Sequence, residues 1–132
     1  MAVVNQELQD TNWKTIIKTT ISSTNSSLTI LNVSDLLGWV TGSIVNLSAI
    51  EWSVDEGTSI SWDGTDGSLI LHFNGSGSYG GSDGMPAIPT TSTGGTEKGD
   101  VILSTDAACN GTIVCVYHKV ETTPGHGNGW SA

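Results

Sequence analysis

Two carboxylate pairs in the sequence could supply the acid and base of a hydrolase, Asp55 with Glu56 and Asp63 with Asp66. A glycosidase needs two carboxyl groups that face each other across a sugar ring. The second pair belongs to DGTDG (63–67), where Asp before Gly is favoured by the backbone geometry of a hairpin turn alone. No serine or cysteine lies in a nucleophile motif such as G-x-S-x-G. The sequence therefore predicts no catalytic residues and no enzyme.

Metal ligands and reactive thiols are also not indicated. Cys115 and His118 are three residues apart, and on a strand such side chains point to opposite faces. The turn aspartates lack the alternating ligands and closing glutamate of an EF-hand, so a weak surface calcium site is only the alternative to plain turn chemistry. Cys109 and Cys115 are predicted to be free thiols, with a disulfide across the intervening Asn-Gly turn as the alternative. We expect no metal and no cofactor.

Composition limits the partners. The chain has 132 residues, enough for one domain, and a formal net charge of −9 with four lysines and no arginine. Binding to nucleic acid or to an anionic membrane surface requires clustered Lys and Arg, so neither partner is expected. The first ten residues lack the basic and apolar segments of a secretory signal, and no apolar run is long enough to span a bilayer. We therefore expect synthesis in a cytoplasm without export by the general route.

The elements that would position these residues are strands. β-branched residues and period-two alternation recur in short segments separated by Gly, Asn, Asp and Ser. The predicted strands are 12–22, 27–33, 43–54, 58–63, 68–74, 100–105 and 112–120. Seven or eight short strands with regular turns indicate an all-β domain over residues 13–120, a β-sandwich or barrel with jelly-roll or Greek-key topology.

Local signals refine this prediction. Turns are expected at 55–57 and 63–67, and Asn-Gly at 110–111 predicts a hairpin. The alternation changes phase near residues 49–50, which predicts a β-bulge. Alternation also predicts which large side chains face inward, namely Trp52, Trp62, Leu69, Leu71 and Phe73.

Three segments are predicted to lie outside the core: an extended N-terminal arm at 1–12, an irregular Gly/Ser/Thr-rich loop at 75–99, and a flexible C-terminal tail at 121–132. An apolar residue in a polar segment is a typical interface anchor. We predict that a partner contacts the apolar residues that lie in or next to these segments or in the loop at 34–40. They are Val3, Val4, Leu8, Trp13, Trp39, Tyr79, Met85, Ile88 and Trp130.

The stretch KGDVILSTDAACNGTIVCVYHKV (98–120) resembles the small β-rich virion proteins of tailed bacteriophages. The shared pattern is Gly-Asp before a strand, then Ser-Thr, then a Gly/Asn/Thr-rich turn, then an alternating strand that ends in Lys. Residues 12–20, 28–36 and 60–65 look similar to earlier strands of that group, so the resemblance covers most of 12–120.

This resemblance implies a capsid decoration, or cement, protein on the virion surface. Such proteins bind the outside of the assembled head, so the expected partner is the major capsid protein, and they often assemble as trimers. A tail or baseplate adaptor is an alternative within the same class. A carbohydrate- or receptor-binding β-sandwich is the alternative outside it, and it would require Trp13, Trp39 or Tyr79 to lie exposed and coplanar on one face.

Overall fold

The computed structural model describes residues 3–11, 13–23, 28–37, 45–63, 69–80, 86–88 and 100–120, and it is all-β apart from one short 3-10 turn. The strands of this described part are β1 (Val3–Asp10), β2 (Lys14–Ile21), β3 (Leu28–Leu31), β4 (Val45–Trp62), β5 (Leu69–Gly80), β6 (Val101–Thr105) and β7 (Gly111–Lys119). The 3-10 turn η1 (Val33–Asp35) follows β3. The prediction of an all-β chain is confirmed.

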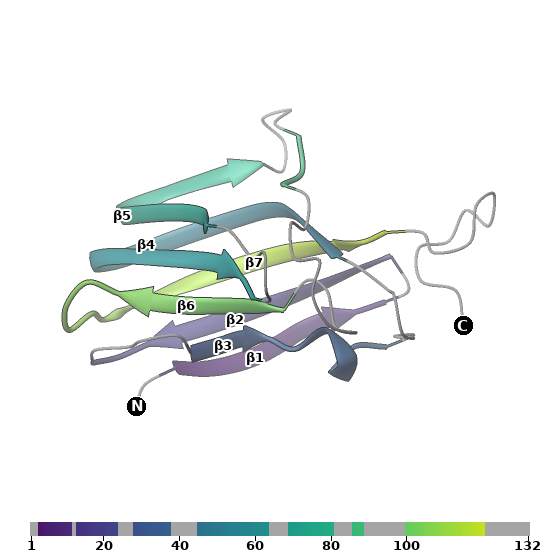
Figure 1. The fold of residues 1–132 in the computed structure, drawn as a ribbon, viewed down its shortest axis with the longest axis horizontal. Helices are drawn as coiled ribbons and strands as arrows, with labels where there is room; N and C mark the ends of the chain where they lie inside the picture. The colour runs from purple at the N-terminus through teal and green to yellow at the C-terminus, as the bar shows by residue number, and fades with distance from the viewer. Residues whose placement is uncertain are drawn as a thin grey trace.

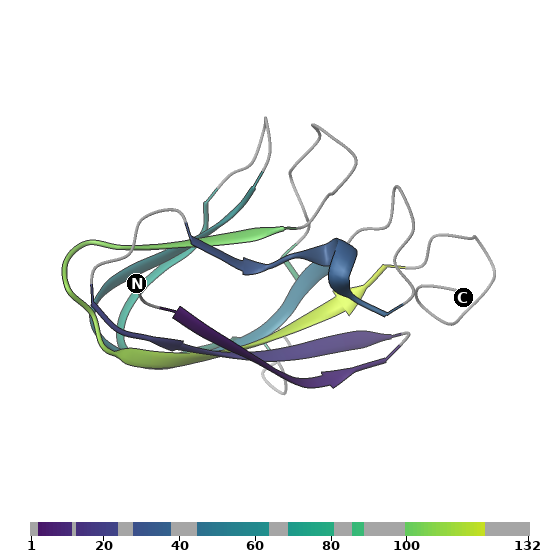
Figure 2. The ribbon, with the colours of Figure 1, turned by 90° about the horizontal axis from the view of Figure 1, so that it is seen from below.

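Six strands form one antiparallel, barrel-like sheet in the order β1-β2-β7-β4-β6-β3, and β5 pairs with β4 outside this path. The sheet folds into two layers, one containing β1, β2 and β7 and the other containing β6 and β3 (Figures 1 and 2). The barrel is nearly closed, because β1 and β3, the two ends of the strand order, approach each other without pairing in the described residues.

Strand β4 belongs to both layers. Residues 45–54 pair with β7, residues 58–62 pair with β6, and β5 runs along the opposite edge. The predicted turn at 55–57 is therefore wrong, since β4 continues through it with a shift of register. The connection between β6 and β7 keeps this stretch extended: Asp55 N donates to Asn110 O (3.2 Å), and Asp106 N donates to Gly57 O (2.8 Å).

That connection also overturns the predicted hairpin at 110–111. Strands β6 and β7 do not pair with each other, because each pairs with β4 in a different layer. The connection between β6 and β7 carries the chain from one layer into the other (Figure 2). Within it the Asn110 N–H donates to the Asp55 carboxylate (2.7 Å). A local turn signal fixes a change of direction but not the partner of the strand that follows.

The core lies between the layers. Strand β2 shows how it forms: Thr15, Ile17, Thr19 and Ile21 are buried and alternate with more exposed residues. Trp62 is fully buried as predicted. Other core residues are large aliphatic and aromatic side chains, among them Ile50, Ile60, Leu103, Ile113 and Tyr117.

Two bulges change which side chains face the core. The register between β4 and β7 shifts between Leu47 and Ala49, one residue before the predicted bulge. A second shift lies between β4 and β5, where consecutive residues of β4 pair with Leu71 and Leu69. Ile70 is the extra residue, and it is buried while Leu69 is 59% exposed, so the predicted inward position of Leu69 is wrong. Phe73 is buried as predicted, and Leu71 is half-buried.

The segments predicted to lie outside the core are partly strands. Residues 3–10 are not an arm but the edge strand β1, which pairs with β2 along its length. Residues 75–80 of the predicted loop continue β5, and Ile88 forms an isolated antiparallel bridge with Leu47. Strand pairing supplies these backbone groups with partners although the residues are polar or glycine. The predicted tail at 121–132 and residues 64–67 of the predicted turn at 63–67 lie outside the described residues.

Candidate functional site

The edge strand β1 exposes two large apolar side chains. Val4 is 68% exposed and Leu8 is 50% exposed. Val4 lies between Val3 and Asn5, whose partners on β2, Ile21 and Thr19, are buried, so Val4 lies on the outer side of the sheet. Leu8 is the extra residue of a bulge, because the register passes from Glu7 opposite Ile17 to Gln9 opposite Ile16. The outer side of β1 therefore presents the apolar side chains of Val4 and Leu8 with the polar Gln6 between them, at the edge of the barrel.

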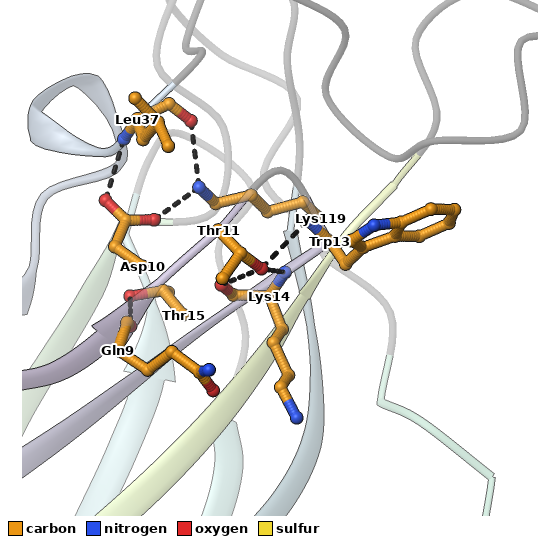
Figure 3. A network of polar contacts seen from close by, with 8 residues as sticks. All are labelled: Gln9, Asp10, Thr11, Trp13, Lys14, Thr15, Leu37 and Lys119. Carbon is orange, nitrogen blue, oxygen red and sulfur yellow. Dashed lines mark hydrogen bonds and ion pairs between the residues drawn. The ribbon is translucent and has the colours of Figure 1, made fainter.

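Trp13 extends this set at the turn between β1 and β2. Its backbone is fixed: the Trp13 N–H donates to the Thr11 hydroxyl (3.2 Å), and its carbonyl accepts from Lys119 N (2.8 Å). Thr11 N also donates to Lys14 O (2.9 Å), which closes the turn. The indole is 51% exposed and points away from this framework (Figure 3). An aromatic side chain on a rigid backbone loses little conformational entropy on binding, which suits an interface anchor.

A buried ion pair holds this end of the barrel together. The Lys119 side chain at the end of β7 is fully buried, and its ammonium contacts the Asp10 carboxylate at the end of β1. Lys119 Nζ also donates to Leu37 O (2.8 Å), and Leu37 N donates to Asp10 Oδ2 (2.8 Å) (Figure 3). The network joins β1, β7 and the segment after η1, so it fixes the frame from which Leu8 and Trp13 project.

The other predicted contact residues are divided between two groups. Val3, Tyr79 and Ile88 are half-buried and pack against the core of the same chain, and the Tyr79 hydroxyl donates to Pro86 O (2.8 Å). Trp39, Met85 and Trp130 lie outside the described residues. Val4, Leu8 and Trp13 are thus the predicted contact residues with the greatest exposure in the described part of the chain.

Two exposed apolar residues were not predicted. Leu37 is 55% exposed beside the Asp10–Lys119 pair, and Leu69 is exposed through the bulge described above. Neither carries a signal in the sequence, because Leu37 is held by residues distant in the chain and Leu69 depends on a register shift with its neighbouring strand.

One histidine–carboxylate pair forms on the surface. His72 Nε2 lies 3.2 Å from Asp106 Oδ2, with both side chains more than half exposed. Gly57 lies against the pair, since a Cβ there would meet the Asp106 carboxylate. The pair joins the β6–β7 connection to β5.

The cysteines are buried free thiols. Burial raises the pKa of Cys115 to about 12, and it raises the pKa of Tyr117 well above 10.0. The Cys109 sulfur lies 3.6 Å from the Thr58 hydroxyl. A buried thiol that stays protonated is a poor nucleophile, so Cys115 contributes packing. The predicted free thiols are confirmed.

The described residues provide neither a metal-binding cluster nor a membrane-spanning helix. They contain no group of three or more His, Cys, Asp or Glu side chains placed to hold a metal ion. They also form no helix with the length and hydropathy needed to cross a bilayer.

Comparison with known proteins adds no relative. No family model matches the chain, and the searches of curated proteins and of solved structures found no match. The functional assignment therefore depends on the surface just described and on the resemblance in the sequence.

Proposed function

We propose that this chain is a non-enzymatic structural protein that binds another protein through the outer side of β1 and the adjacent β1–β2 turn. The observation that carries the proposal is the exposure of Val4, Leu8 and Trp13 on backbone that is fixed by the sheet and by the Asp10–Lys119 network. Tryptophan is among the residues that most often anchor a protein interface, and Val4 and Leu8 would add apolar contact area beside Trp13.

The geometry of β1 favours binding by side chains over addition of a strand. A bulge and a charge that points inward are two devices that block pairing at a sheet edge, and β1 has both, at Leu8 and Glu7. The outer side chains remain accessible despite the blocked edge.

The proposed partner is the major capsid protein of a tailed bacteriophage, and this part rests on the resemblance of residues 98–120 to virion proteins. In this proposal the chain is a capsid decoration protein on the head surface, with jelly-roll or Greek-key topology, assembled as a homo-oligomer with a trimer favoured. Many copies on a symmetric shell gain avidity, so a small anchor set on each copy suffices.

The alternative function, in which Trp13 and Tyr79 together bind a sugar, has less support from the structure. Tyr79 lies on β5, whereas Trp13 lies directly before β2, three strand steps away along β2-β7-β4-β5, which is about 14 Å at the usual strand spacing. Its ring packs on the core and its hydroxyl is bound to Pro86 O. The two aromatic rings therefore do not share one sugar ring.

Sedimentation with isolated capsids tests the proposal. The wild-type protein is expected to co-sediment with capsids and not with isolated tails. The double variant Val4→Ser/Leu8→Ser should bind capsids at least tenfold more weakly, which corresponds to the loss of about 2 kcal/mol of binding free energy. Leu69→Ser is the matched control, because it removes an equally exposed apolar side chain from β5.

Equal capsid binding by the double variant and the wild type would refute the assigned surface. Absence of capsid binding by the wild type would refute the decoration function, and binding to tails would favour the adaptor. Light scattering of the free protein tests the trimer.

A further inference from the structure

The seam of the barrel contains a groove. Strands β1 and β3 end the strand order, and each pairs on one side only within the described residues. A cavity of about 220 Å³ opens between them, and its lining comes from β1, β2, β3 and the segment around η1. Small-molecule sites usually measure about 300–1,000 Å³, so this groove is the size of a side chain rather than of a cofactor.

The floor and the rim of the groove differ in chemistry. The floor is formed by buried aliphatic side chains, Ile17, Ile30, Leu31 and Leu36. The rim carries two carboxylates, Glu7 from β1 and Asp35 from η1. Neither carboxylate has an ion-pair partner among the described residues, and the residues that line the groove include no lysine.

Polar groups beside the carboxylates could hold a backbone. Asn5 Oδ1 accepts from the Thr19 hydroxyl (2.7 Å), and Asn32 Oδ1 accepts from the Ser34 hydroxyl (2.9 Å). These bonds leave the side-chain amide nitrogens of both asparagines, which also line the groove, as donors for a peptide carbonyl.

We infer that the groove between β1 and β3 binds a lysine side chain from an extended segment of a partner protein. The four methylenes of lysine would cover the aliphatic floor while its ammonium lies between Glu7 and Asp35, the arrangement in which this side chain is both desolvated and paired. An extended segment presents alternate side chains to one side, so it places one lysine in the groove and keeps its neighbours outside.

Charge excludes the other occupants. A metal ion would meet two carboxylates above an aliphatic floor, and the described residues contain no group of three or more His, Cys, Asp or Glu side chains placed to hold one. A second copy of the chain would bring a further net charge of −9 to an acidic rim, whereas a basic segment of another protein is complementary to it. The inference does not depend on the partner being a capsid, because it concerns the inner side of β1 and not Val4 or Leu8.

Nuclear magnetic resonance titration with short peptides tests the inference. The probe is a capped five-residue peptide with one central lysine flanked by valine and threonine, and the matched peptides carry norleucine or glutamate instead. The lysine peptide is expected to shift the amide signals of Asn5, Glu7, Thr29 and Asn32, and to bind more weakly as salt is added. The norleucine peptide should bind several-fold more weakly, and the glutamate peptide should not bind.

Protein variants locate the charge. Glu7→Gln and Asp35→Asn should each weaken binding of the lysine peptide roughly two- to fivefold, the range for one partly exposed ion pair. Glu51→Gln, which removes an exposed carboxylate from the outer face of β4, should leave the affinity unchanged. The inference fails if millimolar lysine peptide shifts no groove signal, if the glutamate peptide binds equally, or if Glu51→Gln causes the same loss. Capsid binding measured in parallel separates this failure from a failure of the proposed function.

Discussion

Removal of the Asp10 carboxylate tests whether the buried ion pair stabilises the barrel end. Lys119 is fully buried and the Asp10 side chain is only 10% exposed, so water cannot replace the lost partner. Asp10→Ala leaves a buried ammonium without its carboxylate, which typically costs about 3–5 kcal/mol. The variant also deprives Leu37 N of its acceptor. Because a domain of this size is stable by only about 5–15 kcal/mol, the loss should be a large share of the total.

A double-mutant cycle separates this cost from other effects of the substitution. Lys119→Met keeps an unbranched side chain of similar length and removes the charge, so Asp10→Ala/Lys119→Met should be more stable than Asp10→Ala alone by about 2 kcal/mol or more. Urea unfolding followed by tryptophan fluorescence gives each free energy of unfolding. If Asp10→Ala does not fold, Asp10→Asn takes its place, since its amide oxygen still accepts from Leu37 N.

The exposed pair His72–Asp106 is the matched control. Its side chains are 51% and 62% exposed, and Asp106→Ala should change the stability by less than about 1 kcal/mol, as is usual for exposed pairs. The reasoning would be refuted if Asp10→Ala cost no more than Asp106→Ala, or if the effects at positions 10 and 119 simply added.

Three shorter predictions concern other parts of the fold. Gly75 and Gly80 both have positive φ, but of the two only Gly80 has backbone, the Ser48 carbonyl, where a Cβ would lie. Gly75→Ala should therefore lower the free energy of unfolding in urea by about 1 kcal/mol, and Gly80→Ala should lower it by at least about 1 kcal/mol more. Burial raises the pKa of Cys115 from 9.0 to about 12, so the thiol of the unfolded chain loses its proton first as the pH rises above 9. The free energy of unfolding should therefore fall between pH 9 and 12. Cys115→Ala should reduce this fall, as measured by urea unfolding at alkaline pH. Trp13→Ala should leave the free energy of unfolding within about 0.5 kcal/mol of wild type but weaken capsid co-sedimentation. A larger loss of stability would assign the indole to the fold instead.

Alternation along single strands was predictable because it depends on neighbouring residues alone. The prediction that Trp62 is buried succeeded for this reason. The same period places Lys119 on the inward side of β7 with Ile113, Cys115 and Tyr117, so the sequence carries a signal for a buried lysine. The sequence around Asp10 gives no sign that it is the partner of Lys119, since the two residues are brought together only when β1 and β7 take their places in the folded sheet.

Features that depend on two strands at once were not predictable. The bulge at Ile70 exists only in the register of β5 against β4, and it reverses the side that Leu69 faces. Likewise, the extended path of residues 55–57 depends on hydrogen bonds from the β6–β7 connection some fifty residues later. The exposed residues Val4 and Leu8 were found because they are apolar in a polar segment, although that segment proved to be an edge strand.

The open seam has a physical cause in the sequence. Five antiparallel steps separate β1 from β3, so the two strands run in opposite directions and would be able to pair directly. Direct pairing would bury Glu7, which faces inward opposite Ile17, in contact with the aliphatic floor of the groove. Burial of an unpaired carboxylate costs more than the hydrogen bonds of a short ladder return, since each such bond contributes only about 0.5–1.5 kcal/mol. An exposed position at an open seam is therefore the more favourable one for Glu7, and there the lysine of the proposed partner segment would neutralise its charge.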